Sequence, residues 1–234
     1  FIDNIDEDKL TKIKKEHQLD KVLFIIISKS GNTIETLSNI LALNIIKKKS
    51  KNIIIISEKN NNPLYLLSKK MELFHIEHKN YIGGRYSVLS EVGIVPAYLM
   101  GINIMELRKN LFSYVLSKHK YSLKNSLQIL SSLLKKGKLN TIIFLNYEPK
   151  LQKFLSWNQQ LMAESLGKKT KGFLPFISSV PKDHHSLLQL YLDGPKDKLF
   201  YIFSSENDYK IKIKSKIMGK ELDFLDKKKL SKIK

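Results

Sequence analysis

The stretch Val22–Thr33 reads VLFIIISKSGNT, in which a continuous apolar run leads directly into a polar turn. An unbroken run of β-branched and aromatic residues is typical of a strand buried on both faces of a sheet. From Ile34 to Lys48, apolar residues recur three or four positions apart, as they do on one face of a helix. The stretch therefore predicts a strand, a polar turn and a helix, in that order.

The strand and helix pattern continues through the first half of the chain. Asn52–Ser57 (NIIIIS) predicts a second buried strand, and an Asn-rich breaker separates it from a predicted helix at Leu64–Met71. Leu73–Ile76 is a short strand candidate, and Ser87–Ile104 is expected to be an apolar helix. This alternation indicates an α/β fold with a parallel sheet covered by helices.

A similar pattern begins again in the second half. We expect helical segments at 106–118, 123–136 and 151–166, and strands at 139–146 and 198–204. No low-complexity linker separates the halves, and we place the boundary near Lys118. The sequence thus predicts two domains, residues 1–118 and 119–234.

Composition excludes several classes of protein. The 234 residues include no cysteine, so disulfides and thiolate metal sites are excluded and a cytoplasmic protein is favoured. No apolar run approaches the ~18 residues that cross a membrane, so no membrane partner is expected. The formal charge is +19, but only Arg85 and Arg108 are arginines. Because base recognition favours arginine and stacked aromatics, we interpret the lysines as a solvated surface and expect no nucleic-acid partner; polyanion binding is the lesser alternative.

The turn Ser28–Thr33 is the first candidate site. It lies between a buried strand and the amino end of a helix, where free backbone N–H groups and the helix dipole attract anions. Gly31 lets the backbone approach a ligand closely, and three hydroxyls add donors, so a phosphate fits there. The alternative, an ordinary turn in which Thr33 or Ser30 caps the helix, stays open at this point.

Three further motifs carry chemistry, each with a simpler alternative. Arg85 follows two glycines and could present its guanidinium at a ligand-binding sheet edge, or could be a surface arginine in a tight turn. Gln160 and Glu164 are i, i+4 neighbours that could pair an amide with a carboxylate base, or could form a solvated helix end. His184 and His185 suggest a proton shuttle or a metal site, but no metal-binding spacing accompanies them, so no metal is expected.

The motifs together resemble one family. They are FIIISKSGNTIET at 24–36, GGRYSVLS at 83–90, QQLMAES at 159–165 with Gly167-Lys168, and His185 followed by Gln189-Leu190. In this order, over nearly the whole chain, they are similar to the motifs of glucose-6-phosphate isomerase (phosphoglucose isomerase). The resemblance implies two αβα sandwich domains of the sugar isomerase (SIS) type with parallel sheets. It also implies reversible isomerisation of glucose 6-phosphate to fructose 6-phosphate through a cis-enediolate, in glycolysis and gluconeogenesis.

The resemblance assigns roles residue by residue. Glu164 matches the carboxylate that moves the proton, Arg85 the cation that steadies the enediolate, and His185 the histidine that helps open the ring. Gln160 matches a substrate-binding amide. The sugar phosphate is implied to bind the turn formed by Ser28, Lys29, Ser30, Gly31, Asn32 and Thr33. The family's His185 equivalent comes from a neighbouring subunit, which implies a homodimer.

Two features of the family have no counterpart here. We find neither its Gly-rich, serine-bearing segment before the first motif nor its C-terminal helix with a substrate-binding lysine. We therefore expect a fragment that lacks both ends. Isomerisation needs one base, one proton donor and one cation, so no cofactor is expected. A non-catalytic SIS-domain regulator that binds sugar phosphates is the alternative of another class.

Overall fold

A computed structural model describes residues 1–116, 119–135, 139–205, 211–214 and 220–229. The chain forms two compact units, Phe1–Val115 and Leu116–Lys234. The boundary expected near Lys118 lies outside the described residues and stays a prediction. Each unit has its own parallel sheet and its own hydrophobic core, which confirms the α/β class.

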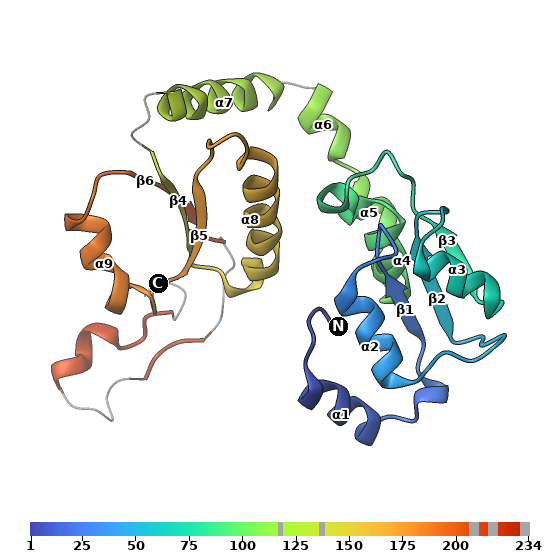
Figure 1. Cartoon of the computed structure of the whole chain (residues 1–234). Coiled ribbons are helices and arrows are strands. Elements are labelled where there is room, and N and C mark those ends of the chain that lie inside the picture. Colours follow the sequence, from blue (N-terminus) through green and yellow to red (C-terminus); the bar gives the residue numbers. More distant parts are fainter. Residues whose placement is uncertain (117–118, 136–138, 206–210, 215–219, 230–234) are drawn as a thin grey trace. The chain divides into compact units, whose positions relative to one another are not determined.

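The first unit is built on a three-stranded parallel sheet in the order β1-β2-β3 (Figure 1). Its strands are β1 (Phe24–Ile27), β2 (Ile53–Ser57) and β3 (Phe74–Glu77). The central strand, β2, is almost fully buried, because helices and neighbouring strands surround its run of isoleucines. The predicted strands at 22–28, 52–57 and 73–76 are thus confirmed to within a few residues.

The chain up to residue 116 also forms helices. They are α1 (Glu7–Glu16), α2 (Ile34–Leu43), α3 (Pro63–Lys70), α4 (Glu91–Leu99), α5 (Ile104–Arg108) and α6 (Leu111–Leu116), with short 3₁₀ turns η1 (Leu19–Lys21) and η2 (Gly84–Leu89). Leu10, Ile40 and Leu64, from α1, α2 and α3, join one buried cluster with Ile53 and Ile55 of β2. Side chains two apart on a strand share a face, so these three helices pack on the same face of the sheet.

The second unit has a three-stranded parallel sheet in the order β5-β4-β6. Its strands are β4 (Thr141–Asn146), β5 (Leu174–Ser179) and β6 (Lys198–Phe203). Its helical elements are α7 (His119–Lys135), η3 (Pro149–Leu151), α8 (Gln152–Leu166), α9 (His184–Asp193) and η5 (Lys220–Leu225).

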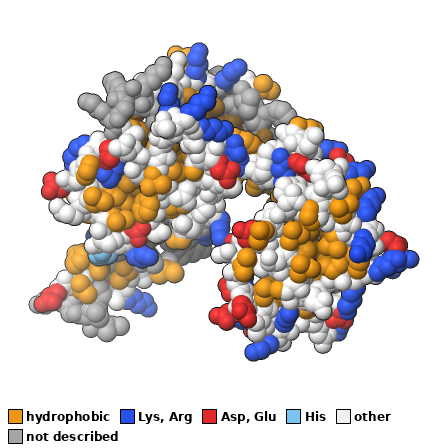
Figure 2. Space-filling model, viewed as in Figure 1, with side chains coloured by type: hydrophobic (Ala, Val, Ile, Leu, Met, Phe, Trp, Pro, Cys, Tyr) orange, Lys and Arg blue, Asp and Glu red, His pale blue; other side chains and the backbone are white. Residues whose placement is uncertain are grey.

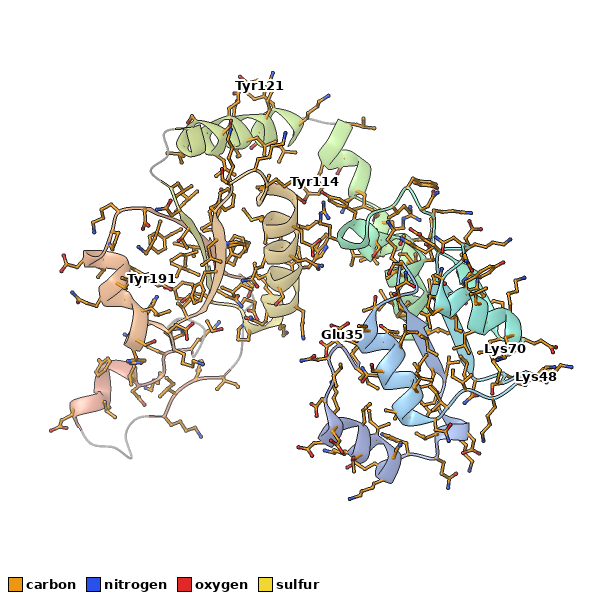
Figure 3. The ribbon with its side chains drawn as sticks, viewed as in Figure 1. Glu35, Lys48, Lys70, Tyr114, Tyr121 and Tyr191 are labelled. Atoms are coloured by element: carbon orange, nitrogen blue, oxygen red, sulfur yellow. The ribbon has the colours of Figure 1, made fainter. Side chains whose placement is uncertain are left out.

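Helices lie on both faces of this second sheet. Phe144 packs with Leu155 of α8 in the buried cluster on one face. On the other face, the ring of Tyr191 on α9 meets Phe200 edge to face at 5.3 Å (Figure 3). Figure 1 likewise shows α8 and α9 on opposite sides of the sheet. The unit is therefore a three-layer αβα arrangement.

Two predicted helices differ from the observed ones. The helix expected over Ile34–Lys48 ends at Leu43, because Asn44 adopts a left-handed conformation (φ 53°) that terminates it. The helix expected over Ser87–Ile104 is split, since Ser90 is extended and separates η2 from α4. The segment 106–118 likewise divides between α5 and α6, and its last two residues lie outside the described part.

Sequence patterning missed α1, β5 and α9. The first has few apolar residues, and β5 contains Pro175, which donates no hydrogen bond to a strand ladder. Because β5 lies at the edge of the described sheet, its proline is tolerated there.

The basic side chains are dispersed over the surface rather than gathered in one patch on the face shown in Figure 2. On this face, Lys and Arg side chains are scattered among acidic and apolar ones on both units. Among the described residues, no helix combines the length and apolar character needed to span a membrane.

Candidate active site

The predicted phosphate turn, Ser28–Thr33, joins β1 to α2 at the carboxyl edge of the first sheet. Ser28 continues the strand ladder, since its backbone N–H donates to the Ile56 carbonyl (3.1 Å), and its hydroxyl lies 2.6 Å from the Thr33 hydroxyl. The Gly31 N–H donates to the Ser28 carbonyl (3.1 Å) and closes the turn. Most of the other side chains of the turn are exposed, so it presents polar groups to solvent.

The amino end of α2 carries no side-chain cap among the described residues. Thr33 occupies the capping position, but its side chain makes no capping hydrogen bond. The Ser30 hydroxyl accepts from the Asn32 N–H (3.3 Å) instead. By contrast, Asp6 caps α1 and Asn62 caps α3. The structure therefore does not show the cap by Thr33 or Ser30 that the alternative expects, and the phosphate-binding role of the turn stays a prediction.

The side chain of Asn62 packs against Gly31 and supports the turn. Gly31 has a positive φ (68°), and an added Cβ would lie 1.8 Å from Asn62 Oδ1. That side chain is buried, donates to the Glu58 carbonyl (2.8 Å) and accepts from the Tyr65 N–H (2.9 Å) as the α3 cap. The Leu64 N–H also donates to the Gly31 carbonyl (3.3 Å). The loop after β2 thus fixes the conformation of the turn after β1.

Lys29 is held against the same neighbouring loop. Its Nζ lies 3.3 Å from Glu58 Oε1, and its carbonyl accepts from the Glu58 N–H (2.9 Å). The ion pair is only partly exposed, so the lysine charge has a defined position beside the turn. A phosphate in the turn would meet this cation at its edge.

Arg85 lies in η2, which follows β3 and precedes α4. Its guanidinium stands over the Tyr86 ring at 5.1 Å from the centroid, and it is half-buried. Two hydroxyls tighten the segment: Ser87 donates to the Gly84 carbonyl (2.6 Å) and Ser90 to the Ser87 carbonyl (2.7 Å). Because this segment leaves the carboxyl end of β3, it starts from the same sheet edge as the phosphate turn.

A buried histidine anchors the segment before Arg85. His78 follows β3 directly and is 1% exposed. Its Nδ1 hydrogen-bonds the Glu91 carboxylate at the start of α4, and its Nε2 lies 3.1 Å from the Ile82 carbonyl. Both ring nitrogens are therefore occupied by parts of the chain that flank Arg85.

Gln160 and Glu164 are directly paired on α8. Gln160 Nε2 donates to Glu164 Oε1 (2.9 Å), and both side chains are exposed. The neighbouring Gln159 points the other way and donates to the Pro175 carbonyl of β5 (2.8 Å). This bond fixes the rotation of α8, so that residues 160 and 164 stay off the sheet-facing side.

His185 stands in the first turn of α9, just beyond β5. Asp183 holds that turn, since its carboxylate accepts from the Ser179 N–H (2.7 Å). The two histidines differ in their surroundings: the His184 ring contacts Tyr147, whereas His185 is exposed. The described residues contain no group of three His, Cys, Asp or Glu side chains that could hold a metal ion.

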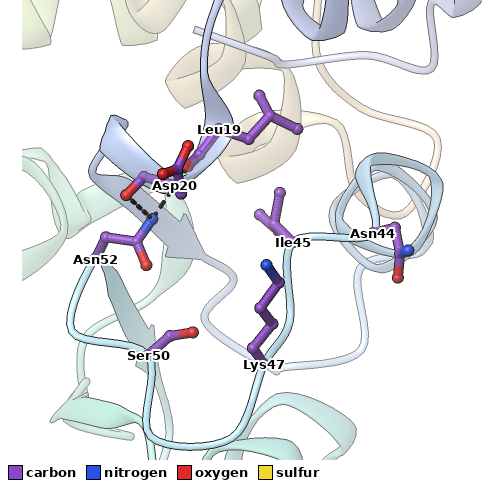
Figure 4. A pocket seen from close by; sticks show the side chains of 7 residues that line it. All are labelled: Leu19, Asp20, Asn44, Ile45, Lys47, Ser50 and Asn52. Atoms are coloured by element: carbon purple, nitrogen blue, oxygen red, sulfur yellow. Dashed lines mark hydrogen bonds between the residues drawn. The ribbon is translucent and has the colours of Figure 1, made fainter.

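A cavity of about 460 Å³ lies at the opposite edge of the first sheet (Figure 4). Its lining includes Lys47 and Asn52, and Asn52 immediately precedes β2. The Asn52 amide donates to the Leu19 (3.1 Å) and Val22 (2.9 Å) carbonyls. Its polar group is thus used to tie the chain together at the amino ends of the strands, away from the candidate site.

The candidate residues are divided between the two units. The turn and Arg85 belong to the first, and Gln160, Glu164 and His185 to the second. The structure brings the members of the turn together and pairs Gln160 with Glu164, while a common site for all of them stays a prediction. Sequence reasoning missed the supporting residues Glu58, Asn62, His78, Glu91, Gln159 and Asp183. Asn62 precedes a proline at a helix start, and Gln159 and Asp183 lie within or beside motifs identified in the sequence, but none of these signals predicted a supporting role.

Comparisons with known proteins agree on one family. The sequence model of the phosphoglucose isomerase family matches residues 1–177. The probable glucose-6-phosphate isomerase of Methanococcus maripaludis is 34% identical over 92% of this chain and 50% of its own length. The glucose-6-phosphate isomerase of Methanocaldococcus jannaschii is 36% identical over 85% of this chain and 51% of its own length. The chain therefore spans about half the length of these curated relatives.

A solved structure supports the fold. The crystal structure of a hypothetical protein from Thermus thermophilus has a TM-score of 0.80 to this chain, covering 99% of it and 59% of the other chain. The two sequences are 24% identical, so this likeness shows the fold alone.

Proposed function

The chain belongs to the phosphoglucose isomerase family, and we propose that the protein interconverts glucose 6-phosphate and fructose 6-phosphate. The observation that carries the proposal is the uncapped amino end of α2 beside the hydroxyl-bearing turn Ser28–Thr33. Uncapped N–H groups, a helix dipole and the adjacent Lys29 together favour the dianionic phosphate of a sugar phosphate. The sugar would then extend from this anchor towards the catalytic groups.

The remaining candidate residues supply what an aldose–ketose isomerisation needs. The Glu164 carboxylate removes a proton from C1 of fructose 6-phosphate and returns one to C2, and Gln160 orients that carboxylate through their hydrogen bond. The Arg85 guanidinium stabilises the negative charge that develops on the enediolate oxygens. His185 transfers the proton that opens the ring. The electron pair moves within the substrate, so the reaction needs no external oxidant or reductant.

Further parts of the proposal come from the family resemblance. Each unit is a sugar isomerase-type domain, and the αβα layering of the second unit supports this. The protein is a cytoplasmic homodimer in which His185 reaches the partner's substrate. Its exposed position at the start of α9 is compatible with a role in another subunit. The non-catalytic regulator has no support among the relatives described above, which are named as isomerases.

A coupled assay tests the proposal. The full-length protein is given fructose 6-phosphate, and glucose 6-phosphate is detected through its dehydrogenase. We expect turnover that Glu164→Gln lowers by ~10²–10⁴-fold, because an amide of the same shape cannot accept the proton. Glu16→Gln is the matched control. It makes the same carboxylate-to-amide change at another exposed glutamate, on α1, and should leave turnover unchanged. Absence of turnover in the unmodified protein, or equal turnover in both variants, would refute the assignment.

A further inference from the structure

The segment that carries Arg85 is closed at both ends by one buried imidazole. His78 stands at the end of β3, where its backbone N–H donates to the Ser57 carbonyl (2.8 Å). Its ring then reaches Ile82, the residue before the glycine pair, and Glu91, the first residue of α4. Residues 79–90 therefore form a loop whose two ends meet at a single side chain.

The protons on this ring can be assigned from its partners. A backbone carbonyl only accepts, so Nε2 must carry a hydrogen to bond Ile82. Nδ1 faces a carboxylate, so the second bond needs a further proton, either on Nδ1 or on Glu91. With both bonds, the ring joins the two ends of the loop.

The second half of the loop also packs against α4, because a Cβ added at Gly93 would lie 2.0 Å from the Val88 carbonyl oxygen. Gly84 has open space around it, with nothing within 4 Å of where a Cβ would stand. Two glycines in succession let the backbone adopt many conformations. The internal bonds, from Ser87 to Gly84 and from Ser90 to Ser87, tighten η2 but do not tie it to the sheet. In the first half of the loop, His78 joins Ile82 to β3 and to the start of α4.

We propose that His78 and Glu91 are a positioning pair that fixes Arg85 for charge stabilisation in the transition state. This inference rests on the proposed function, in which Arg85 meets the enediolate oxygens. A guanidinium placed about 1 Å off target loses much of its effect on the rate, whereas phosphate binding depends on a different turn. The pair therefore acts on the catalytic constant more than on ground-state binding.

Two substitutions at Glu91 separate positioning from bulk stability. Glu91→Ala removes the hydrogen bond between the His78 ring and residue 91. Glu91→Gln preserves both bonds of the ring, because its amide can donate to Nδ1 of a neutral ring whose Nε2–H still bonds Ile82. His75→Gln is the matched control: this histidine also lies on β3, but its ring bonds Ser57 and meets Tyr65 edge to face, and neither contact involves residues 79–90.

The variants are compared in the full-length protein at about pH 8, where free histidines are neutral. For Glu91→Ala we expect kcat to fall by about 10- to 100-fold with KM for fructose 6-phosphate nearly unchanged. Glu91→Gln should recover most of that loss, and His75→Gln should leave kcat unaltered. Hydrogen exchange should accelerate over residues 79–90 in Glu91→Ala only.

The inference and the proposed function fail in different ways. An unmodified protein without isomerase activity would refute the function. The exchange rates of residues 79–90 would still test whether the His78–Glu91 pair holds the loop. Activity with unchanged kcat in folded Glu91→Ala would overturn the positioning role. Equal losses in Glu91→Ala and His75→Gln would also overturn it, because they would indicate a general effect on stability.

Discussion

Gly31→Ala is the sharpest test of how the phosphate turn is built. The backbone at this position has φ 68°, and the new Cβ would lie 1.8 Å from Asn62 Oδ1 and 2.2 Å from its Cγ. No side-chain Cβ approaches another atom this closely, so the Asn62 side chain must leave its place. The substitution therefore removes the α3 cap as well as straining the turn.

The expected cost can be summed from these contacts. A left-handed conformation costs a residue with a Cβ about 1–2 kcal/mol. Loss of the bond from the Tyr65 N–H to Asn62 costs about 1 kcal/mol, as for other helix caps. The displaced amide also loses its bonds to Glu58 and Asn60 in a buried place, for about 1–2 kcal/mol more. Gly31→Ala should thus lower the free energy of unfolding of the first unit by about 3–5 kcal/mol.

Native-state hydrogen exchange of the β2 amides measures this free energy. Gly101→Ala is the matched control, because Gly101 has a similar φ (79°) but open space around it, and it should lose only the backbone strain of about 1–2 kcal/mol. In an Asn62→Gly background, which also removes the Asn62 Cβ at 2.9 Å, the added cost of Gly31→Ala should fall to a similar value. Equal losses for Gly31→Ala and Gly101→Ala would refute the reasoning, since the clash with Asn62 would then have no effect.

Other outcomes follow from single side chains. Arg85→Lys should lower kcat well beyond any change in KM, because an ammonium cannot replace a planar guanidinium at the enediolate; steady-state kinetics that show only a raised KM would contradict this role. Burial first, and then the charge of Lys69, lowers the pKa of His75 from 6.5, so the unfolded chain binds its proton at a higher pH than the native chain. Stability should therefore fall as pH drops below about 6.5 towards the folded pKa, and urea unfolding of His75→Gln should show a flatter pH dependence; an identical slope would exclude this cause. Asn52→Ala should cost about 1–3 kcal/mol in urea unfolding yet leave phosphate affinity unchanged, because its bonds lie at the opposite sheet edge; weakened phosphate binding would count against placing the site at the carboxyl edge.

The regular parts of the fold were predictable because local patterns determine them. The isoleucine run of β2 can be buried only in the middle of a sheet, and the turn at Ser28–Thr33 interrupts apolar residues with polar ones. The edge strand β5 was missed because its composition, LPFISS, includes a proline and two serines. It forms because β4 offers it a ladder, which is a tertiary interaction that no local pattern records.

The candidate site divides in the same way. Arg85, Glu164 and the phosphate turn are carried by short motifs, so they were found in the sequence, although their roles stay proposals. The pair of His78 and Glu91 joins residues 13 positions apart across a loop, and no spacing rule connects them. Such supporting contacts depend on the folded backbone and become visible only in the structure.

Isomerisation in deuterium oxide tests the central claim most directly. Fructose 6-phosphate is incubated with the full-length protein, and the product is followed by proton NMR at C2 of glucose 6-phosphate. A proton carried by Glu164 exchanges with solvent, so the account predicts glucose 6-phosphate with deuterium at C2, formed ~10²–10⁴-fold more slowly by Glu164→Gln. Failure to form glucose 6-phosphate, or formation of product without any deuterium at C2, would contradict it.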